Sequence, residues 1–386
     1  MSEYQYYEFS AIDRRLDSRE MKELRALSTR AEITPTSFVN EYHWGDFKGD
    51  PRKLMHRYFD AFVYVANWGT HRLMFRLPRG LIDERAMTPY FPGEGLDWEL
   101  KGDQAVLEFR SENEDGDWEE GVEGLMESLV PLREDLLAGD YRALYLGWLA
   151  VARSGDIEDT DAEPPVPSGL GELSAPLTAL AEFLRVDRNL IAAAAQRSAG
   201  KVTTGPGQEE LGDFIDALPG AEKNRLLLRL AESDGLGARR DLLERFRQSR
   251  PIPAPQTAEG GRTVAELFSA ADAIETERLR AEADRKARAA ARRAREEAAA
   301  REEHLNGLAG RELDLWRQVE FFIVAKPARY DSAVALLRDL KDLAARSAGQ
   351  AHFSAELAQF RDRHAKKRTL LSRLDKAGLR AADPKA

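Results

Sequence analysis

The chain has 386 residues, and at roughly 150 residues per domain this length suggests two or three domains. A hydrophobic content of 43% is sufficient for buried cores and excludes a chain that is disordered throughout. The absence of cysteine excludes disulfides, thiolate zinc sites and cysteine nucleophiles. The formal net charge of -10 excludes a uniformly basic protein of the kind that coats nucleic acid.

The charge is distributed unevenly along the chain. Residues 1–262 carry 32 basic and 47 acidic side chains, whereas residues 263–386 carry 25 basic and 20 acidic ones. The acidity is concentrated between positions 92 and 164, where 21 acids face 5 bases. An acidic module and a mildly basic module on one chain indicate either mutual contact or different partners.

The beginning of the chain shows no basic segment followed by an apolar one. Nor does any stretch approach the roughly 18 uncharged apolar residues that a membrane span needs. We therefore expect a cytoplasmic protein with no membrane partner.

Residues 1–155 predict an α+β domain with an antiparallel sheet and covering helices. Alternating, aromatic-rich segments predict strands at 4–12 and 35–42 and hairpins at 61–78 and 96–112. Two helices are predicted to begin at the capping residues Asp17 and Asp50, the second with Pro51 at its first position. Two further helices, at about 118–138 and 141–153, would cover one face of the sheet.

Shifts in composition predict the rest of the organisation. We expect an acidic, proline-rich linker at 156–169, a small helical bundle at 170–250 and a Pro/Gly linker at 251–262. A long helix rich in Ala, Arg and Glu is expected at 263–304, and a C-terminal helical hairpin or bundle at 305–380. The predicted fold class is thus an α+β N-terminal domain followed by all-α helical domains joined by a long charged helix.

The long helix carries opposite charges four residues apart, a spacing that favours ion pairs along one face. At 1.5 Å per residue it would form a rod of roughly 60 Å. Its composition is of the coiled-coil type, but its apolar stripe is mostly alanine, which argues against a strong leucine-type coiled coil. A free-standing charged helix, or one lying against its own domain, fits better.

Signatures of P-loop proteins, dinucleotide-binding folds, serine hydrolases, zinc proteases and kinases are absent. The glycines within 201–210 favour a plain loop over an anion site. The acidic stretch 111–122 fails the calcium-loop pattern because Val122 stands where a bidentate Glu is required.

The segment 41–71 is the strongest candidate for chemistry. It holds side chains of the types that bind zinc, manganese or iron, namely His43, Asp46, His56, Asp60 and His71. Their spacing matches no metal motif, and no cofactor is predicted. The aromatic residues of the segment favour a core corner or a protein-binding surface, with four candidate partner-binding residues, Trp44, Phe47, Tyr58 and Trp68.

Nucleic-acid binding is a further alternative. The basic stretch near the C-terminus offers candidate phosphate contacts at Arg363, Lys366, Lys367 and Arg368. The stretch has no aromatic residues for base stacking, so sequence-specific recognition is not indicated.

The segments "YYEFSAIDR", "ITPTSFVNEYHWGDFKGDP" and "RYFDAFVYVANWGT" resemble those of an uncharacterised family of bacterial proteins. The later segments "LAGRELDLWRQVE" and "YDSAVALLRDLKDLAAR" resemble the same family, so the likeness covers much of the chain. The resemblance implies neither an activity nor any functional residue.

Three functions are consistent with these patterns. We favour a non-enzymatic cytoplasmic interaction or scaffold protein, part of a larger bacterial assembly, because catalytic motifs are missing and two modules of opposite charge are joined by a helix. The first alternative is a metal-assisted hydrolase or nuclease that uses the histidines and aspartates of segment 41–71. The second is a nucleic-acid-associated factor that acts through its C-terminal basic helices.

Overall fold

The computed structural model describes residues 4–113, 122, 124–200, 208–231 and 261–380, together with positions 238, 241–242, 245–246 and 249. The chain divides into two compact units, Met1–Arg278 and Leu279–Ala386. Within the described part of the chain, no helix combines the length and the apolar character that a membrane span requires.

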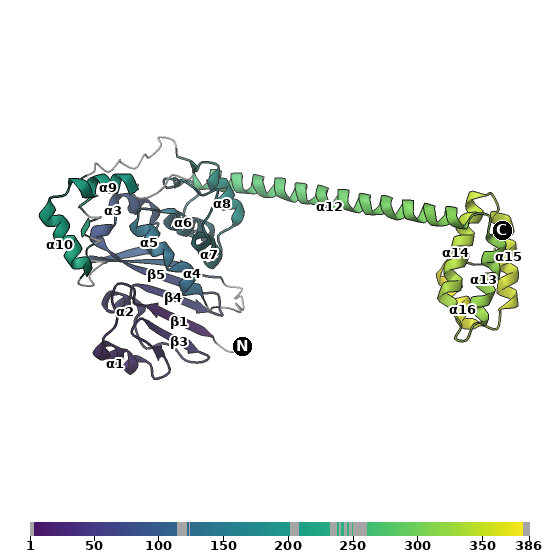
Figure 1. Cartoon of the computed structure of the whole chain (residues 1–386), viewed down its shortest axis with the longest axis horizontal. Helices are drawn as coiled ribbons and strands as arrows, with labels where there is room; N and C mark the ends of the chain where they lie inside the picture. The colour runs from purple at the N-terminus through teal and green to yellow at the C-terminus, as the bar shows by residue number, and fades with distance from the viewer. Residues whose placement is uncertain are drawn as a thin grey trace. The chain divides into compact units, whose positions relative to one another are not determined.

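The first unit is built on a seven-stranded antiparallel sheet with strand order β2-β3-β1-β4-β5-β7-β6. Figure 1 labels β3, β1, β4 and β5, which follow one another in this order. The strands are β1 (Gln5–Ser10), β2 (Glu32–Ile33), β3 (Ser37–Tyr42), β4 (Ala61–Ala66), β5 (His71–Pro78), β6 (Leu96–Lys101) and β7 (Gln104–Ser111). Both predicted hairpins, β4–β5 and β6–β7, are confirmed. The α+β class predicted for the N-terminal part is therefore confirmed as well.

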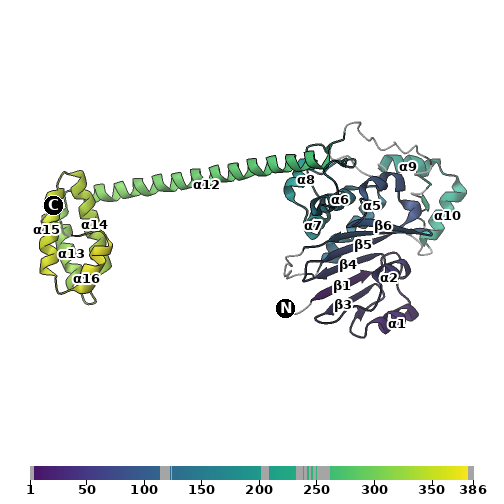
Figure 2. The same cartoon turned by 180° about the vertical axis from the view of Figure 1, so that it is seen from behind.

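Two helices pack on one face of the sheet, α1 (Ser18–Leu27) and α2 (Pro51–Arg57), and Figure 2 shows them beside β1, β3 and β4. Both begin where the sequence predicts. Asp17 caps α1 in a reciprocal capping box with Glu20, and Asp50 caps α2 with Pro51 in its first turn. Between these helices and the sheet lies a core rich in aromatic rings.

The opposite face of the sheet is covered by helices that share one large core with it. These are α4 (Leu125–Leu129), α5 (Pro131–Leu137), α6 (Arg142–Ser154), α7 (Ala175–Phe183) and α8 (Arg188–Ala195). The short elements η1 (Arg79–Leu81), α3 (Glu84–Met87) and η2 (Thr88–Tyr90) join β5 to β6.

The helices on this face differ from the prediction in two ways. The helix expected at 118–138 is divided into α4 and α5 at Pro131, which begins a new helix instead of continuing the old one; residues 118–121 lie outside the described part. We expected a separate bundle from residue 170, but α7 and α8 belong to the core of the sheet. Two more helices follow, α9 (Gln208–Ala217) and α10 (Gly220–Ala231).

The segment predicted as an acidic linker is anchored to the first unit. Its Glu163 accepts two hydrogen bonds from the Arg262 guanidinium, at 2.7 and 2.9 Å, and one from the Tyr145 hydroxyl. Ala162 pairs with Thr263 in an isolated β-bridge. Composition alone marked this segment as exposed because its basic partner stands 99 residues further along the chain.

The long helix is α12 (Val264–Leu308). Its first turns are buried in the core of the first unit through Val264 and Leu267, and every residue from 283 to 300 is exposed. Of the expected ion pairs, Glu282–Lys286 and Arg292–Glu296 form, at 2.9 and 3.5 Å. Arg278 pairs with Glu275 instead of Glu282.

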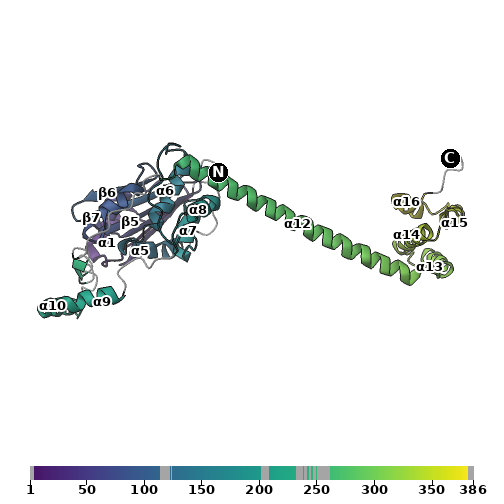
Figure 3. The same cartoon turned by 90° about the horizontal axis from the view of Figure 1, so that it is seen from above.

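The second unit contains the end of α12 and four further helices, which Figure 3 shows side by side. They are α13 (Glu312–Val324), α14 (Tyr330–Arg346), α15 (Gln350–Arg363) and α16 (Arg368–Lys376). The helical C-terminal part predicted from the sequence is thus confirmed. The glycine-containing segment 201–207 and most of the acidic stretch 111–122 lie outside the described residues.

Candidate functional site

One row of side chains crosses four adjacent strands of the sheet. Tyr7 of β1 lies opposite Tyr64 of β4, Tyr64 lies opposite Arg72 of β5, and Arg72 lies opposite Arg110 of β7. Directly paired residues of antiparallel strands project from the same face, so the four form a continuous line. We call Tyr7, Tyr64, Arg72 and Arg110 the open row.

The next row on the same face lies two residues away along each strand and is buried. Phe9, Phe62 and Met74 are opposite one another in the pairing and are all fully buried. We call these three residues the closed row. Towards the sheet edge the same register continues with Glu108 and Asp97, so the apolar row ends in two carboxylates.

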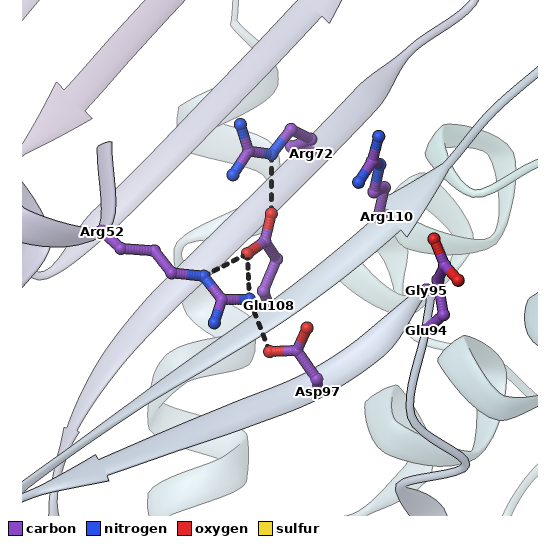
Figure 4. A pocket seen from close by; sticks show the side chains of 7 residues that line it. All are labelled: Arg52, Arg72, Glu94, Gly95, Asp97, Glu108 and Arg110. Atoms are coloured by element: carbon purple, nitrogen blue, oxygen red, sulfur yellow. Dashed lines mark hydrogen bonds and ion pairs between the residues drawn. The ribbon is translucent and has the colours of Figure 1, made fainter. Parts of the chain in front are cut away.

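Two adjoining cavities lie along the open row. The larger, which we call the sheet groove, has a volume of about 690 Å³ and is lined by the open row together with Gln5, Gly45, Asp46, Phe47, Gly49, Pro51, Trp68 and Thr70. The smaller, of about 380 Å³, is drawn in Figure 4 and is lined by Arg52, Arg72, Glu94, Gly95, Asp97, Glu108 and Arg110. Arg72 and Arg110 line both cavities, so the arginine pair stands where they meet.

Gln5 holds the aromatic half of the open row in place. Its side-chain carbonyl accepts hydrogen bonds from the hydroxyls of Tyr7 and Tyr64, at 2.8 and 3.0 Å. Its amide nitrogen donates to the backbone carbonyl of Gly45 at 3.0 Å. The Tyr7 hydroxyl also lies 3.0 Å from Asp46. Because Gln5 is only 4% exposed, this network fixes both phenols from beneath.

The phenols of the open row stay neutral over the physiological range. Burial raises the pKa of Tyr64 to about 12. Burial also raises the pKa of Tyr7, and the neighbouring Tyr64 and Asp46 raise it further. Both side chains therefore offer a ligand an aromatic ring and a neutral hydroxyl.

Glu108 organises the arginines at the other end of the groove (Figure 4). One of its oxygens accepts a hydrogen bond from Nε of Arg72 at 2.6 Å, and the other accepts two from Arg52, at 2.8 and 2.5 Å. Arg52 also donates to Asp97 at 2.5 Å. Burial acts to lower the pKa of Arg52, but its hydrogen bonds and ion pairs with Glu108 and Asp97 together outweigh burial, and the pKa is raised. These bonds tie α2 to β6 and β7.

Arg72 and Arg110 retain capacity for a ligand. The terminal nitrogens of Arg72 have no hydrogen-bond partner among the described residues, and Figure 4 shows them directed away from Glu108. Arg110 donates to Glu112, but both side chains of this pair are largely exposed and such pairs contribute little stability. The groove thus combines two aromatic rings with two guanidinium groups that can bind an oxyanion.

Glycine at position 69 shapes the turn beside the groove. Gly69 has φ +93°, and a Cβ atom there would lie 2.0 Å from the backbone oxygen of Asn113. Its own carbonyl accepts hydrogen bonds from the Asn113 amide and the Arg185 guanidinium, both at 3.1 Å. This turn places Trp68, which is 44% exposed, at the rim of the groove.

The five candidate metal ligands do not come together. No group of three or more His, Cys, Asp or Glu side chains within the described residues is arranged to hold a metal ion. His43 is exposed and stands against Tyr4, with ring centroids 5.5 Å apart, and Asp46 is bonded to Tyr7 at the groove. His56 lies on α2, where its Nε2 is 3.5 Å from Glu99.

The remaining two candidates have structural partners. Asp60 is fully buried. One of its oxygens accepts two hydrogen bonds from Arg76, at 2.6 and 3.1 Å, and the other accepts two from the backbone amides of Ile12 and Asp13. His71 is buried against Phe183, whose carbonyl lies 2.8 Å from its Nδ1. The structure therefore does not assemble the site that the hydrolase hypothesis requires.

The four candidate partner-binding residues are divided between core and surface. Phe47 and Tyr58 are 7% and 3% exposed and belong to the aromatic core. Phe47 also lines the sheet groove. Trp44 and Trp68 are 67% and 44% exposed. Of these two, only Trp68 lines the groove.

The candidate phosphate contacts near the C-terminus are partly committed to the second unit. Arg363 forms an ion pair with Glu320 at 3.0 Å, and Lys367 donates to the carbonyl of Ile323 at 3.4 Å. Lys366 and Arg368 are exposed. Half of the proposed phosphate contacts thus hold α13 against the turn between α15 and α16.

No protein-family model, no curated protein and no solved structure matches the chain. The residues of the open row were not among the predicted site residues. A signal for them was present, because aligning the predicted hairpin 61–78 on its turn places Tyr64 beside Arg72. The pairing of Arg72 with Arg110 depends on which strands are neighbours, which the sequence does not reveal.

Proposed function

We propose that the protein is a non-enzymatic interaction or scaffold protein whose first unit binds an extended segment of a partner protein in the sheet groove. The observation that carries this proposal is the open row itself. Four side chains in line on adjacent strands face a cavity of about 690 Å³, while the next row along the same strands is sealed by helices.

The chemistry of the groove fits a polypeptide ligand. Aromatic rings, fixed hydroxyls and a small number of charged groups are typical of sites where one partner side chain anchors and polar contacts set its orientation. Trp68 stands at the rim, where an exposed indole can cover a bound side chain. Gln5 and Glu108 already fix the orientation of Tyr7, Tyr64 and Arg72, which lowers the entropy that binding must overcome.

The test compares three full-length proteins as affinity baits in native lysate: the wild type, Trp68→Ala, and the control Trp44→Ala. The control removes an equally large indole that is exposed but does not line the groove. We expect the wild type and the control to retain a stoichiometric partner that Trp68→Ala loses. Capture of the same proteins by all three baits would refute the proposal.

A further inference from the structure

We infer that Arg72 and Arg110 together recognise one carboxylate, supplied by an acidic side chain of the bound partner segment. This inference rests on the proposed function, because it names the chemistry of the segment that would occupy the sheet groove.

The arginine pair is placed where an anion is favoured. Arg72 and Arg110 are directly opposite on neighbouring strands, and like charges in that position repel each other. From Arg72, Glu108 accepts a hydrogen bond only from Nε. The ion pair between Arg110 and Glu112 lies at the exposed surface. An oxyanion bound between the two guanidinium groups would relieve the repulsion and use the terminal nitrogens of Arg72, which have no hydrogen-bond partner among the described residues.

The surrounding charges select a single negative charge. Three arginines line the two cavities, but so do four carboxylates, Asp46, Glu94, Asp97 and Glu108. A dianionic phosphate would be repelled by these carboxylates more strongly than a carboxylate would be, and a nucleic acid would also meet the net charge of -15 carried by residues 1–262. A planar monoanion matches the planar guanidinium donors.

The spacing of the strands defines a sequence pattern for the partner. Adjacent strands are about 4.8 Å apart, so the midpoint between Arg72 and Arg110 lies about 7 Å from Tyr64 across the sheet. Two residues of an extended peptide span about 6.6 Å, and their side chains point to the same side. A segment lying across the strands would therefore place an acidic residue two positions from the apolar or aromatic residue that packs on Tyr64 and under Trp68.

Two more baits test this inference within the same capture experiment. Arg110→Gln removes one guanidinium whose only ion pair among the described residues is the exposed one with Glu112. Arg19→Gln removes a matched charge, because Arg19 is an exposed arginine of the same unit whose one ion pair within the described part of the chain is with Glu23. We expect Arg110→Gln to capture at least about tenfold less partner than the wild type, and Arg19→Gln to capture as much as the wild type.

The outcomes separate the inference from the function on which it rests. Loss of the partner with Trp68→Ala but not with Arg110→Gln would overturn the carboxylate inference and leave the proposed function standing. Retention by every variant would overturn both. Loss with Arg19→Gln as well as Arg110→Gln would also overturn the inference, because it would indicate a general charge effect.

A randomised peptide display library identifies the ligand chemistry directly. Selection on the full-length wild type is expected to enrich Asp or Glu two positions from an apolar or aromatic residue, and selection on Arg110→Gln is expected to lose this enrichment. The enriched peptide is then synthesised with Glu, Gln or phosphoserine at the acidic position. Binding about tenfold tighter for Glu than for Gln supports the inference, whereas tighter binding of phosphoserine, or no acidic enrichment, overturns it.

Discussion

The closed row and the open row lie side by side on the same strands and have opposite roles. In the closed row, Phe9 and Phe62 pack with ring centroids 4.4 Å apart beneath the helices of the first unit. In the open row, Tyr7 and Tyr64 pack at 4.6 Å, but their hydroxyls and the arginines beyond them face a cavity. A shift of two residues along a strand thus separates a row that is sealed beneath helices from a row that lines a cavity.

Alternating aromatic residues predict which side chains share a face of the sheet, but they do not predict which part of that face helices will cover. β1 and β4 carry aromatic residues in both rows, so their pattern is the same on either side of the boundary. The boundary is set by α2, whose Arg52 is held by Glu108 and Asp97. The boundary between the two rows therefore depends on tertiary contacts.

The largest expected effect comes from opening the closed row. Phe62→Ala removes a fully buried ring and should lower the free energy of unfolding by about 3–5 kcal/mol, measured by urea denaturation. A milder change in the open row, Tyr64→Phe, removes only a hydroxyl bonded to Gln5 and should lower the free energy of unfolding by about 1 kcal/mol. Equal effects of the two variants would remove the distinction between the rows.

A second large effect is expected where the closed row ends. Glu108→Gln leaves Arg52 and Arg72 without the buried carboxylate that both bind, and should lower the free energy of unfolding by about 1.5–3 kcal/mol in thermal or urea melts. Because the variant also removes a negative charge beside Arg72, binding of an acidic peptide should be preserved or strengthened. Weaker peptide binding by a folded variant would show that Glu108 acts mainly by positioning Arg72.

A smaller, pH-dependent effect is expected in α1, which covers the closed row. The hydrogen bond from Arg14 and that from the backbone amide of Asp17 hold the pKa of Glu20 at about 2. Since the folded-state pKa is lowered, the stabilisation is present above the unfolded-state value near 4.3 and is lost as the pH falls through about 2.

Glu20→Gln tests this dependence. At pH 6 the variant should be less stable than the wild type by no more than about 1 kcal/mol, because the ion pair is partly exposed. The difference should shrink as the pH is lowered from about 4.5 towards 2, followed by urea denaturation at each pH. A difference that stays constant over this range would contradict the assigned pKa.

The smallest effect on stability is expected for the residue with the largest effect on binding. Trp68→Ala should change the free energy of unfolding by no more than about 0.5 kcal/mol, because the indole is 44% exposed at the rim of the groove. Circular dichroism melts of this variant and of Trp44→Ala should coincide within that margin. A large destabilisation by Trp68→Ala would identify the indole as a core residue.

Much of the fold could be predicted from the sequence because its signals are local. Asp17, Asp50 and Pro51 mark helix starts that depend on neighbouring backbone groups, and both hairpins depend on short turns. The uninterrupted charge pattern likewise predicted the long helix.

The candidate site could not be predicted in the same way because it depends on contacts between distant residues. The histidines and aspartates of segment 41–71 share a sequence neighbourhood but are distributed over two faces of the sheet and the loops. Arg72 and Arg110 are 38 positions apart and meet only because β5 pairs with β7. Likewise, Glu163 lies in a segment whose composition predicts an acidic linker, and its partner Arg262 stands 99 residues further along the chain.

We propose that a partner segment occupies the sheet groove over the open row. Hydrogen–deuterium exchange of the full-length chain, with and without the captured partner or the selected acidic peptide, tests it most directly. We expect slower exchange in the loops 43–49 and 67–70, which border the groove, and unchanged exchange in α14 and α15. Protection confined to the helices of the second unit, with the two loops unchanged, would contradict the account.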